Sequence, residues 1–263
     1  MATAPDWRTR HALVTGGARG IGRAVTQALL TRGARVTVLG RSPLAADRLR
    51  TLAGSTDAAA RLQAVAADVA EPAAVMQAFA QARAGFGPID TLVNNAGQAH
   101  SAPFMKMDMP LWQQMLAVNL TGTMVCTQAA LPDMLATGWG RIVNVASTAA
   151  QRGYAYVSAY CAAKHGVLGL TRALALELAT KGVTVNAVCP GYTETDLLKD
   201  SIANIVAKTG RSEDEARAQL AAGNPQKRLV QPAEVADAVL WLCQTDSGSV
   251  TGQAISVSGG EVM

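Results

Sequence analysis

The sequence predicts an α/β fold: a single doubly wound domain over residues 1–263, with a seven-stranded, mostly parallel sheet flanked by helices. Short apolar stretches alternate with longer helical stretches along the chain, which is the pattern of strand–helix–strand units. A glycine-rich turn joins the first strand to the first helix. No stretch rich in proline, glycine and serine divides the chain, so we expect one domain rather than two.

The expected elements follow one another in order. Strands are expected at residues 11–15, 35–39, 62–66, 89–93, 141–146, 183–188 and 254–257. Helices are expected at about residues 21–31, 43–53, 72–84, 110–135 and 232–243, and another carries residues 160–164 and ends near residue 180. The more charged stretch 192–230 interrupts the last crossover, and Ser212–Glu215 form a capping box within it. Ligands bind at the carboxyl ends of parallel strands, so we expect this stretch to be a helical substrate lid.

Composition argues against several classes of function. Hydrophobic residues make up 49% of the chain and charged residues 16%, which suits a large core. The net charge of +4 comes from scattered basic residues, so we expect no nucleic-acid partner. The four cysteines are far apart, so we expect free, buried thiols and no metal site. Residues 1–11 lack an apolar signal core and no apolar run would span a membrane, so we expect a cytoplasmic protein without a membrane partner.

Gly16, Gly20 and Gly22 lie between the first strand and the first helix. Glycine suits a tight turn because it adopts backbone angles that other residues disfavour. It also lets the backbone approach a pyrophosphate at a helix N-terminus, where free N–H groups bind anions. The strand–turn–helix context favours a Rossmann dinucleotide-binding turn, which includes Arg19 and Ile21, over a glycine turn that binds nothing.

The end of the second strand indicates which dinucleotide is bound. NAD-binding domains place an acidic residue there for the ribose hydroxyls, but no Asp or Glu occurs between Arg23 and Ala46. Arg41 and Ser42 occupy that place, where an arginine can pair with a 2′-phosphate. Arg19 supports the same preference. We therefore expect NADP(H) rather than NAD(H); if Arg41 is only an exposed loop residue, no preference follows.

Three polar residues form the candidate reactive centre. Tyr160 and Lys164 are four residues apart, so a helix places them on one face, one turn apart. We expect the Lys164 ammonium to lower the pKa of Tyr160 from its reference value of about 10. Tyr160 then exchanges a proton with a substrate oxygen, and Ser147, at the end of the fifth strand, polarises the same carbonyl. This chemistry suits hydride exchange between a nicotinamide and a carbonyl carbon.

Further motifs extend this pattern along the chain: Thr15–Gly22, Asp68–Val69, Asn94–Gly97, Asn119, Ser147, Tyr160–Lys164 and Pro190–Gly191. With them the chain resembles the short-chain dehydrogenase/reductase family over almost its full length. The resemblance implies an NAD(P)-dependent oxidoreductase with a Rossmann fold. Within the family, the segment Pro190–Asp196 and the ending Val257–Met263 are similar to those of 3-oxoacyl reductases and 3-hydroxyacyl-CoA dehydrogenases.

The resemblance also implies residue roles. Asp68 and Val69 contact the adenine, and Lys164 holds the nicotinamide ribose. Asn119 holds a water that links Lys164 to solvent as a proton relay. The full set of expected cofactor contacts is Gly16, Arg19, Gly20, Ile21, Gly22, Arg41, Ser42, Asp68, Val69, Asn95, Ala96, Gly97, Tyr160, Lys164, Pro190, Gly191, Thr193 and Thr195.

Loops that follow the strands supply the candidate substrate contacts, which are Ser147, Gln98, Gln151, Tyr154 and Tyr192. Tyr154 and Tyr156 favour a substrate with an apolar or aromatic part. Lys181 is a candidate contact for an acyl carrier protein. The resemblance further implies a homotetramer, and the helices near residues 110–135 and 155–180 are the candidate interface.

Three functions stay open at this point. The first is reduction of a 3-oxoacyl thioester on CoA or on a carrier protein. The second is reduction or dehydrogenation of small or aryl ketones and secondary alcohols. The third is an NADP-binding sensor without turnover, which the presence of both Tyr160 and Lys164 disfavours. Substrate, physiological direction and product stereochemistry are left open by the sequence.

Overall fold

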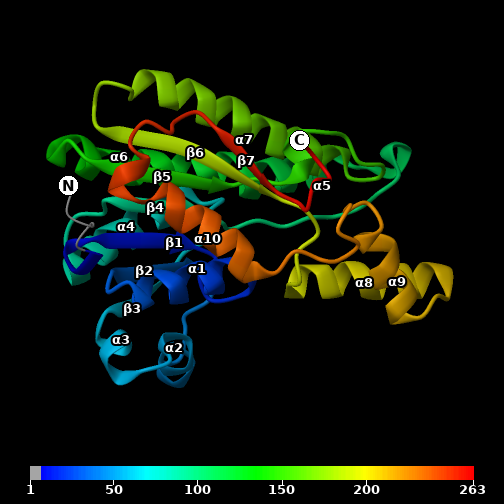
Figure 1. The fold of residues 1–263 in the computed structure, drawn as a ribbon, viewed down its shortest axis with the longest axis horizontal. Helices are drawn as coiled ribbons and strands as arrows, with labels where there is room; N and C mark the ends of the chain where they lie inside the picture. The colour runs from blue at the N-terminus through cyan, green and yellow to red at the C-terminus, as the bar shows by residue number, and fades with distance from the viewer. Residues whose placement is uncertain (1–6) are drawn as a thin grey trace.

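The structure is a computed structural model, which describes residues 7–263 except for the side chains of residues 197, 200, 201, 204 and 208. Its centre is a seven-stranded sheet in the order β3-β2-β1-β4-β5-β6-β7, and all neighbouring strands are parallel (Figure 1). The strands are β1 His11–Thr15, β2 Arg35–Gly40, β3 Leu62–Ala66, β4 Thr91–Asn94, β5 Gly140–Val145, β6 Val183–Pro190 and β7 Ala254–Val257. The predicted fold class is confirmed, and the sheet is wholly rather than mostly parallel. Residues 1–6, part of the segment considered for a signal sequence, lie outside the described residues.

Helices connect the strands in the order expected of right-handed crossovers. They are α1 Gly20–Thr31, α2 Ala46–Ala53, α3 Thr56–Ala60, α4 Pro72–Phe86, α5 Met109–Leu116, α6 Gly122–Thr137, α7 Ser158–Glu177, α8 Asp196–Thr209, α9 Glu213–Ala221 and α10 Pro232–Leu242. Short 3₁₀ turns lie at Trp7–Thr9, Phe104–Lys106, Thr148–Ala150 and Thr245–Ser247. The helix expected over residues 110–135 is interrupted by a π-helical turn, Ala117–Thr121, between α5 and α6.

Two hydrophobic layers hold the helices on opposite faces of the sheet. Successive residues of a strand point to opposite faces, and in β1 the side chain of Val14 packs in one layer while Leu13 packs in the other. The first layer includes side chains from α1 and α10, such as Leu29 and Val239. The second includes side chains from α4 and α6, such as Phe79. This arrangement is the doubly wound architecture.

The strand order reverses direction between β1 and β4, and this is where the loops after those strands separate. Thr15, the last residue of β1, fixes the neighbouring loop. Its hydroxyl accepts hydrogen bonds from the backbone N–H groups of Asn95 and Ala96, both at 2.9 Å. The Asn95 side-chain amide donates back to the Thr15 carbonyl at 2.9 Å. The crevice that binds ligands in such sheets is therefore built from rigidly connected loops.

Residues 192–230 form an insertion that extends from the body and carries α8 and α9 (Figure 1). An isolated bridge between Thr193 and Val230 closes its base. The two helices share a small hydrophobic cluster of their own, which includes Leu198 and Ala216. The predicted capping box is present, with Ser212 accepting from the Glu215 N–H at 3.2 Å.

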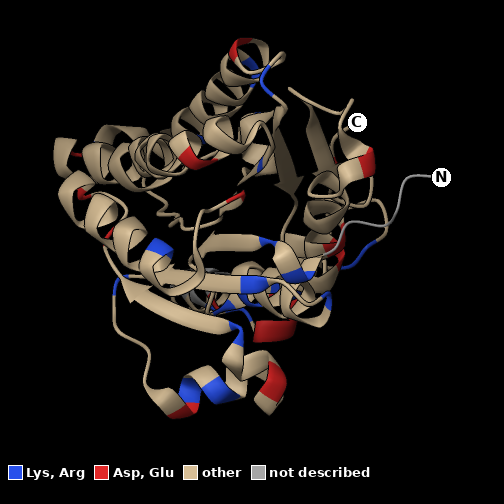
Figure 2. Ribbon diagram, turned by 90° about the vertical axis from the view of Figure 1, so that its left-hand side faces the viewer, with Lys and Arg blue, Asp and Glu red and all other residues tan. Residues whose placement is uncertain are grey.

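The distribution of charged residues and the state of the cysteines agree with what the sequence predicts. Figure 2 shows basic and acidic residues interspersed over the ribbon rather than gathered by sign. All four cysteines are free and buried, as expected. Among the helices of residues 7–263, none combines the length and apolarity that crossing a membrane requires.

Candidate active site

The turn after β1 forms a cradle at the N-terminus of α1. Gly16 and Gly20 have φ angles of 65° and 52°, in the left-handed region that glycine adopts without strain. Arg19 precedes the helix and makes no side-chain capping bond, and no acidic residue lies in the first turn. The first N–H groups of α1 are therefore available to an anion. Gly22 packs closely against this turn, since a Cβ there would lie 2.3 Å from the Gly16 carbonyl oxygen.

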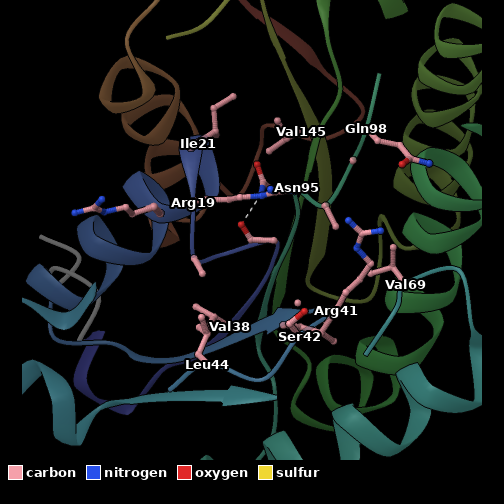
Figure 3. A pocket seen from close by; sticks show the side chains of 18 of the residues that line it. Arg19, Ile21, Val38, Arg41, Ser42, Leu44, Val69, Asn95, Gln98 and Val145 are labelled. Atoms are coloured by element: carbon pink, nitrogen blue, oxygen red, sulfur yellow. Dashed lines mark hydrogen bonds between the residues drawn. The ribbon is translucent and has the colours of Figure 1, made fainter. Parts of the chain in front are cut away.

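A cleft of about 900 Å³ opens beside this cradle, along the carboxyl edge of the sheet (Figure 3). Most of the predicted cofactor contacts line it. These residues are Gly16, Arg19, Gly20, Ile21, Arg41, Ser42, Asp68, Val69, Asn95, Ala96, Gly97, Lys164 and Thr195, together with the predicted substrate contact Gln98. The predicted contacts that do not form its wall are Gly22, Tyr160, Pro190, Gly191 and Thr193. Gly22 lies beneath the cradle, and Pro190 is buried at the end of β6.

Arginines dominate the charge of the cleft. Arg19 and Arg41 extend from the loops after β1 and β2, and Arg41 and Ser42 lie next to each other in Figure 3. Arg23 and Arg48 also line the cleft, and neither was predicted as a contact from the sequence. Arg23 lies one turn into α1 and Arg48 lies near the start of α2. Both positions follow the loops that carry Arg19 and Arg41, and this proximity in the sequence could have identified them. The carboxylates in the wall come from Asp68 and Asp196, so none lies at the end of β2.

Ser147, Tyr160 and Lys164 come together at the end of β5. Lys164 is buried in α7, and its Nζ donates to the carbonyl oxygen of Val145 at 2.9 Å. This ammonium lies 5.8 Å from the centre of the Tyr160 ring. Ser147 has an extended backbone, and its side chain caps the 3₁₀ turn that follows, accepting from the Ala149 N–H at 3.1 Å. A hydrogen bond also joins Ser147 to Tyr160. The predicted grouping is therefore present.

The pKa of Tyr160 is shifted in the direction opposite to the prediction. Burial raises the pKa of Tyr160 to about 12, and the hydrogen bond with Ser147 opposes this rise only in part. Burial also lowers the pKa of Lys164 to about 8. Loss of hydration disfavours the charged form of both groups, and the Lys164 ammonium is held by Val145 rather than by the phenol oxygen. At neutral pH the site therefore holds a neutral phenol beside a mostly charged ammonium.

Asn119 lies in the π-helical turn and is fully buried. Its side chain binds the loop after β4 through both ends, donating to the Gln98 carbonyl at 3.0 Å and accepting from the Gln98 N–H at 3.2 Å. It also donates to the Met115 carbonyl at 3.0 Å. Single π-helical turns often mark functional sites. Here the turn places a polar side chain where it fixes the cleft wall.

The predicted substrate contacts lie in loops that meet at the same edge. Tyr154 packs edge-on against Tyr192, with ring centres 6.4 Å apart. The Gln151 side chain accepts a hydrogen bond from Ser256 at 3.0 Å. Tyr154 donates to Glu261 at 2.6 Å, a contact between residues so far apart in the sequence that no local pattern predicts it.

Lys181 is not near this edge. It precedes β6 by two residues, so it lies at the amino end of the strands, whereas the cleft is at their carboxyl ends. Lys181 therefore does not lie at the entrance of the cleft, where a candidate contact for an acyl carrier protein would have to be.

Comparison with known proteins identifies the class. Residues 10–205 match the family profile described as short chain dehydrogenase. The chain belongs to this family, and it is an NAD(P)-dependent oxidoreductase of it.

Individual relatives cover almost the whole chain. An acetoacetyl-CoA reductase of Rhizobium meliloti (strain 1021) is 37% identical over 259 residues, which are 96% of this chain and 98% of that protein. A cis-4-hydroxycyclohexanecarboxylate dehydrogenase of Sinomonas cyclohexanicum is 39% identical over 252 residues, 95% of this chain and 96% of that protein. A crystal structure of a variant of actinorhodin polyketide ketoreductase with NADPH superposes with a TM-score of 0.90 at 38% identity, covering 99% of both chains.

Gly22→Ala tests whether the cradle depends on close backbone packing. The added Cβ would meet the Gly16 carbonyl at 2.3 Å, so we expect a loss of about 1–3 kcal/mol in the free energy of unfolding, measured in urea. Gly169→Ala in α7 is the matched control, because a Cβ there meets nothing within 4 Å. Equal stability of the two variants would contradict the packing role of Gly22.

Proposed function

We propose that this protein is an NADPH-dependent ketone reductase, and that its substrate is a 3-oxoacyl thioester carried on CoA or on a carrier protein. The observation that carries the proposal is the grouping of Ser147, Tyr160 and Lys164 at the end of β5, beside an arginine-lined cleft. A phenol, a hydroxyl and an ammonium at one point, next to a phosphate cradle, suit proton transfer coupled to hydride transfer.

The residues of the cleft fit NADPH. The uncapped N-terminus of α1 and the turn at Gly16 and Gly20 would hold the pyrophosphate. Arg41, with Ser42 and Arg48, would hold the 2′-phosphate, since the wall has no carboxylate at the end of β2. Asp68 and Val69 would lie at the adenine. When bound, NADPH supplies the hydride that reduces the carbonyl carbon.

Tyr160 is the proposed proton donor. Because burial keeps its pKa at about 12, the phenol is protonated at neutral pH and is ready to give its proton to the carbonyl oxygen. Ser147, already hydrogen bonded to Tyr160, would donate to the same oxygen and fix its orientation. A protonated phenol is the form that this reduction step requires.

Lys164 and Asn119 support this step. Lys164 lines the cleft, where it would hold the nicotinamide ribose, and its ammonium attracts the negative charge that Tyr160 acquires on losing its proton. Gly97 lies between Lys164 and Asn119: a Cβ there would be 3.7 Å from the Lys164 Nζ and 2.8 Å from the Asn119 Oδ1. This proximity supports Asn119 as a member of the relay that returns a proton from solvent.

The thioester assignment is supported by the acetoacetyl-CoA reductase and the polyketide ketoreductase among the similar proteins. Residues 192–230 are the proposed lid, because their base lies beside Tyr192 at the substrate edge. We further propose a cytoplasmic homotetramer. Leu135 on α6 and Leu176 on α7 are 44% and 82% exposed, and an interface through these helices would cover both side chains.

A second candidate is a reductase or dehydrogenase of small or aryl ketones and secondary alcohols. The pair of tyrosines at the substrate edge, Tyr154 and Tyr192, favours a ring-shaped substrate portion. The relative that acts as a cis-4-hydroxycyclohexanecarboxylate dehydrogenase supports the same reading. A non-catalytic NADP sensor is disfavoured because Tyr160 and Lys164 are both present and grouped with Ser147. Assaying acetoacetyl-CoA, carrier-linked oxoacyl substrates and aryl ketones with both cofactors separates the candidates.

Tyr160→Phe removes the proposed proton donor and keeps the ring. We expect kcat/KM for NADPH-dependent ketone reduction to fall by about 10²–10⁴-fold, while NADPH binding, followed by its fluorescence, is retained. Tyr156→Phe is the matched control, because Tyr156 lies just before α7, is 66% exposed and does not line the cleft. Turnover by Tyr160→Phe within a few-fold of the wild type would contradict the assignment. Tight NADPH binding by a wild type that reduces no ketone would instead favour the sensor.

Arg41→Asp tests the choice of cofactor. Loss of a bidentate contact to the 2′-phosphate should raise the KM for NADPH by about 10- to 100-fold and leave the KM for NADH unchanged or lower. Arg50→Asp is the control, because Arg50 is exposed on α2 and is not part of the cleft wall. An unchanged ratio of NADPH to NADH efficiency in Arg41→Asp would overturn the role of Arg41.

A further inference from the structure

Glu261 lies in the segment after β7. Its carboxylate lies between three loops at the carboxyl edge of the sheet, where the predicted substrate contacts meet. It accepts a hydrogen bond from the Tyr154 hydroxyl at 2.6 Å. A Cβ added at Gly191, after β6, would lie 3.0 Å from its Oε2, and one at Gly223, after α9, would lie 3.4 Å from its Oε1. The loops after β5, β6 and the proposed lid therefore all pack against one charged group.

The direction of the hydrogen bonds around Tyr154 follows from chemistry. A carboxylate only accepts, so the single phenol proton points to Glu261. The Thr148 hydroxyl, 2.8 Å from the same phenol oxygen, must then donate to it. Thr148 is buried and directly follows Ser147, the proposed carbonyl polariser. Two hydrogen bonds thus connect Thr148, the residue after Ser147, through Tyr154 to Glu261.

The segment that carries Glu261 is itself held firmly. Gly259 and Gly260 have φ angles of 61° and 91°, and a Cβ on Gly259 would lie 2.1 Å from the Asn224 Oδ1. The Glu261 N–H donates to the Ser258 carbonyl at 3.2 Å. The Glu261 carbonyl accepts from Arg152 at 3.5 Å. The carboxylate is therefore presented from a fixed turn rather than from a free chain.

We propose that Glu261 is a positioning residue that sets substrate specificity, by fixing the aromatic wall formed by Tyr154 and Tyr192. This inference rests on the proposed function, because the wall would lie against the part of the substrate beyond the carbonyl. Tyr192 stands edge-on to Tyr154, with ring planes at 81°, so a rotation of Tyr154 changes the shape of the wall as a whole. Substrates with a large apolar or aromatic part should depend on Glu261, whereas small ketones should not.

The test compares acetophenone with ethyl acetoacetate in NADPH-dependent reduction. For Glu261→Ala we expect the KM for acetophenone to rise about tenfold, which corresponds to the loss of one hydrogen bond to a charged group. The KM for ethyl acetoacetate, the kcat values for both ketones and the Kd for NADPH should stay within about threefold of the wild type. Glu261→Gln keeps an acceptor oxygen and should restore most of the affinity for acetophenone. Glu213→Ala, an exposed acid on α9, is the control.

Tyr154→Phe completes the experiment. If both residues act through one hydrogen bond, Glu261→Ala, Tyr154→Phe and the double variant should show the same KM for acetophenone. The inference is overturned if Glu261→Ala leaves that KM unchanged, if both ketones and NADPH are affected alike, or if the effects of the two substitutions add.

A measurement without turnover separates this inference from the proposed function. With fluorotyrosine at position 154, the fluorine NMR resonance should move in Glu261→Ala and stay in place in Glu213→Ala. If the wild type reduces neither ketone, the proposed function fails, and this resonance still decides whether Glu261 positions Tyr154. An unmoved resonance in Glu261→Ala would overturn the positioning role.

Discussion

The hydrogen bond from the Lys164 ammonium to the Val145 carbonyl holds the rest of the site in place. A buried ammonium without a partner would cost several kcal/mol, so α7 must lie where this carbonyl is within reach. Val145 is the last residue of β5, which ties the helix to the carboxyl end of the strand. One turn before Lys164, Tyr160 then meets Ser147, which follows the strand by two residues. The contact between Lys164 and Val145 thus places the Tyr160 phenol and the Ser147 hydroxyl beside the cleft.

The parallel sheet explains why distant segments meet at this point. All seven strands run in the same direction, so every loop that leaves a carboxyl end reaches one edge. The loops after β1 and β2 supply the cradle and arginines, and the loop after β5 supplies the hydroxyl. The segment after β7 supplies Glu261, which is separated by 107 residues from its partner Tyr154. The same geometry excludes Lys181, which precedes a strand.

Features written in short stretches of sequence were predictable. The glycine turn, the continuous apolar strands and the spacing of Tyr160 and Lys164 are local, and the structure has them where the sequence indicated. Two other features depend on packing and were not predictable. The pKa of Tyr160 follows from burial, which no spacing reveals, and the Tyr154–Glu261 contact follows from how loops fold together. The π-helical turn at Asn119 interrupts a stretch that reads as one helix, and the Asn119 side chain bonds to the loop after β4, a contact that depends on the fold.

The central claim is that a protonated Tyr160 beside a charged Lys164 delivers the proton during reduction. The pH dependence of the rate of a single turnover, with NADPH and ketone both saturating, tests it most directly. With the pKa of Tyr160 at about 12 and that of Lys164 at about 8, the rate should be level at acidic and neutral pH and fall as the pH rises through about 8, where Lys164 loses its charge. A rate that instead climbs through neutrality would mean that a phenolate is the reactive form, and would contradict the account.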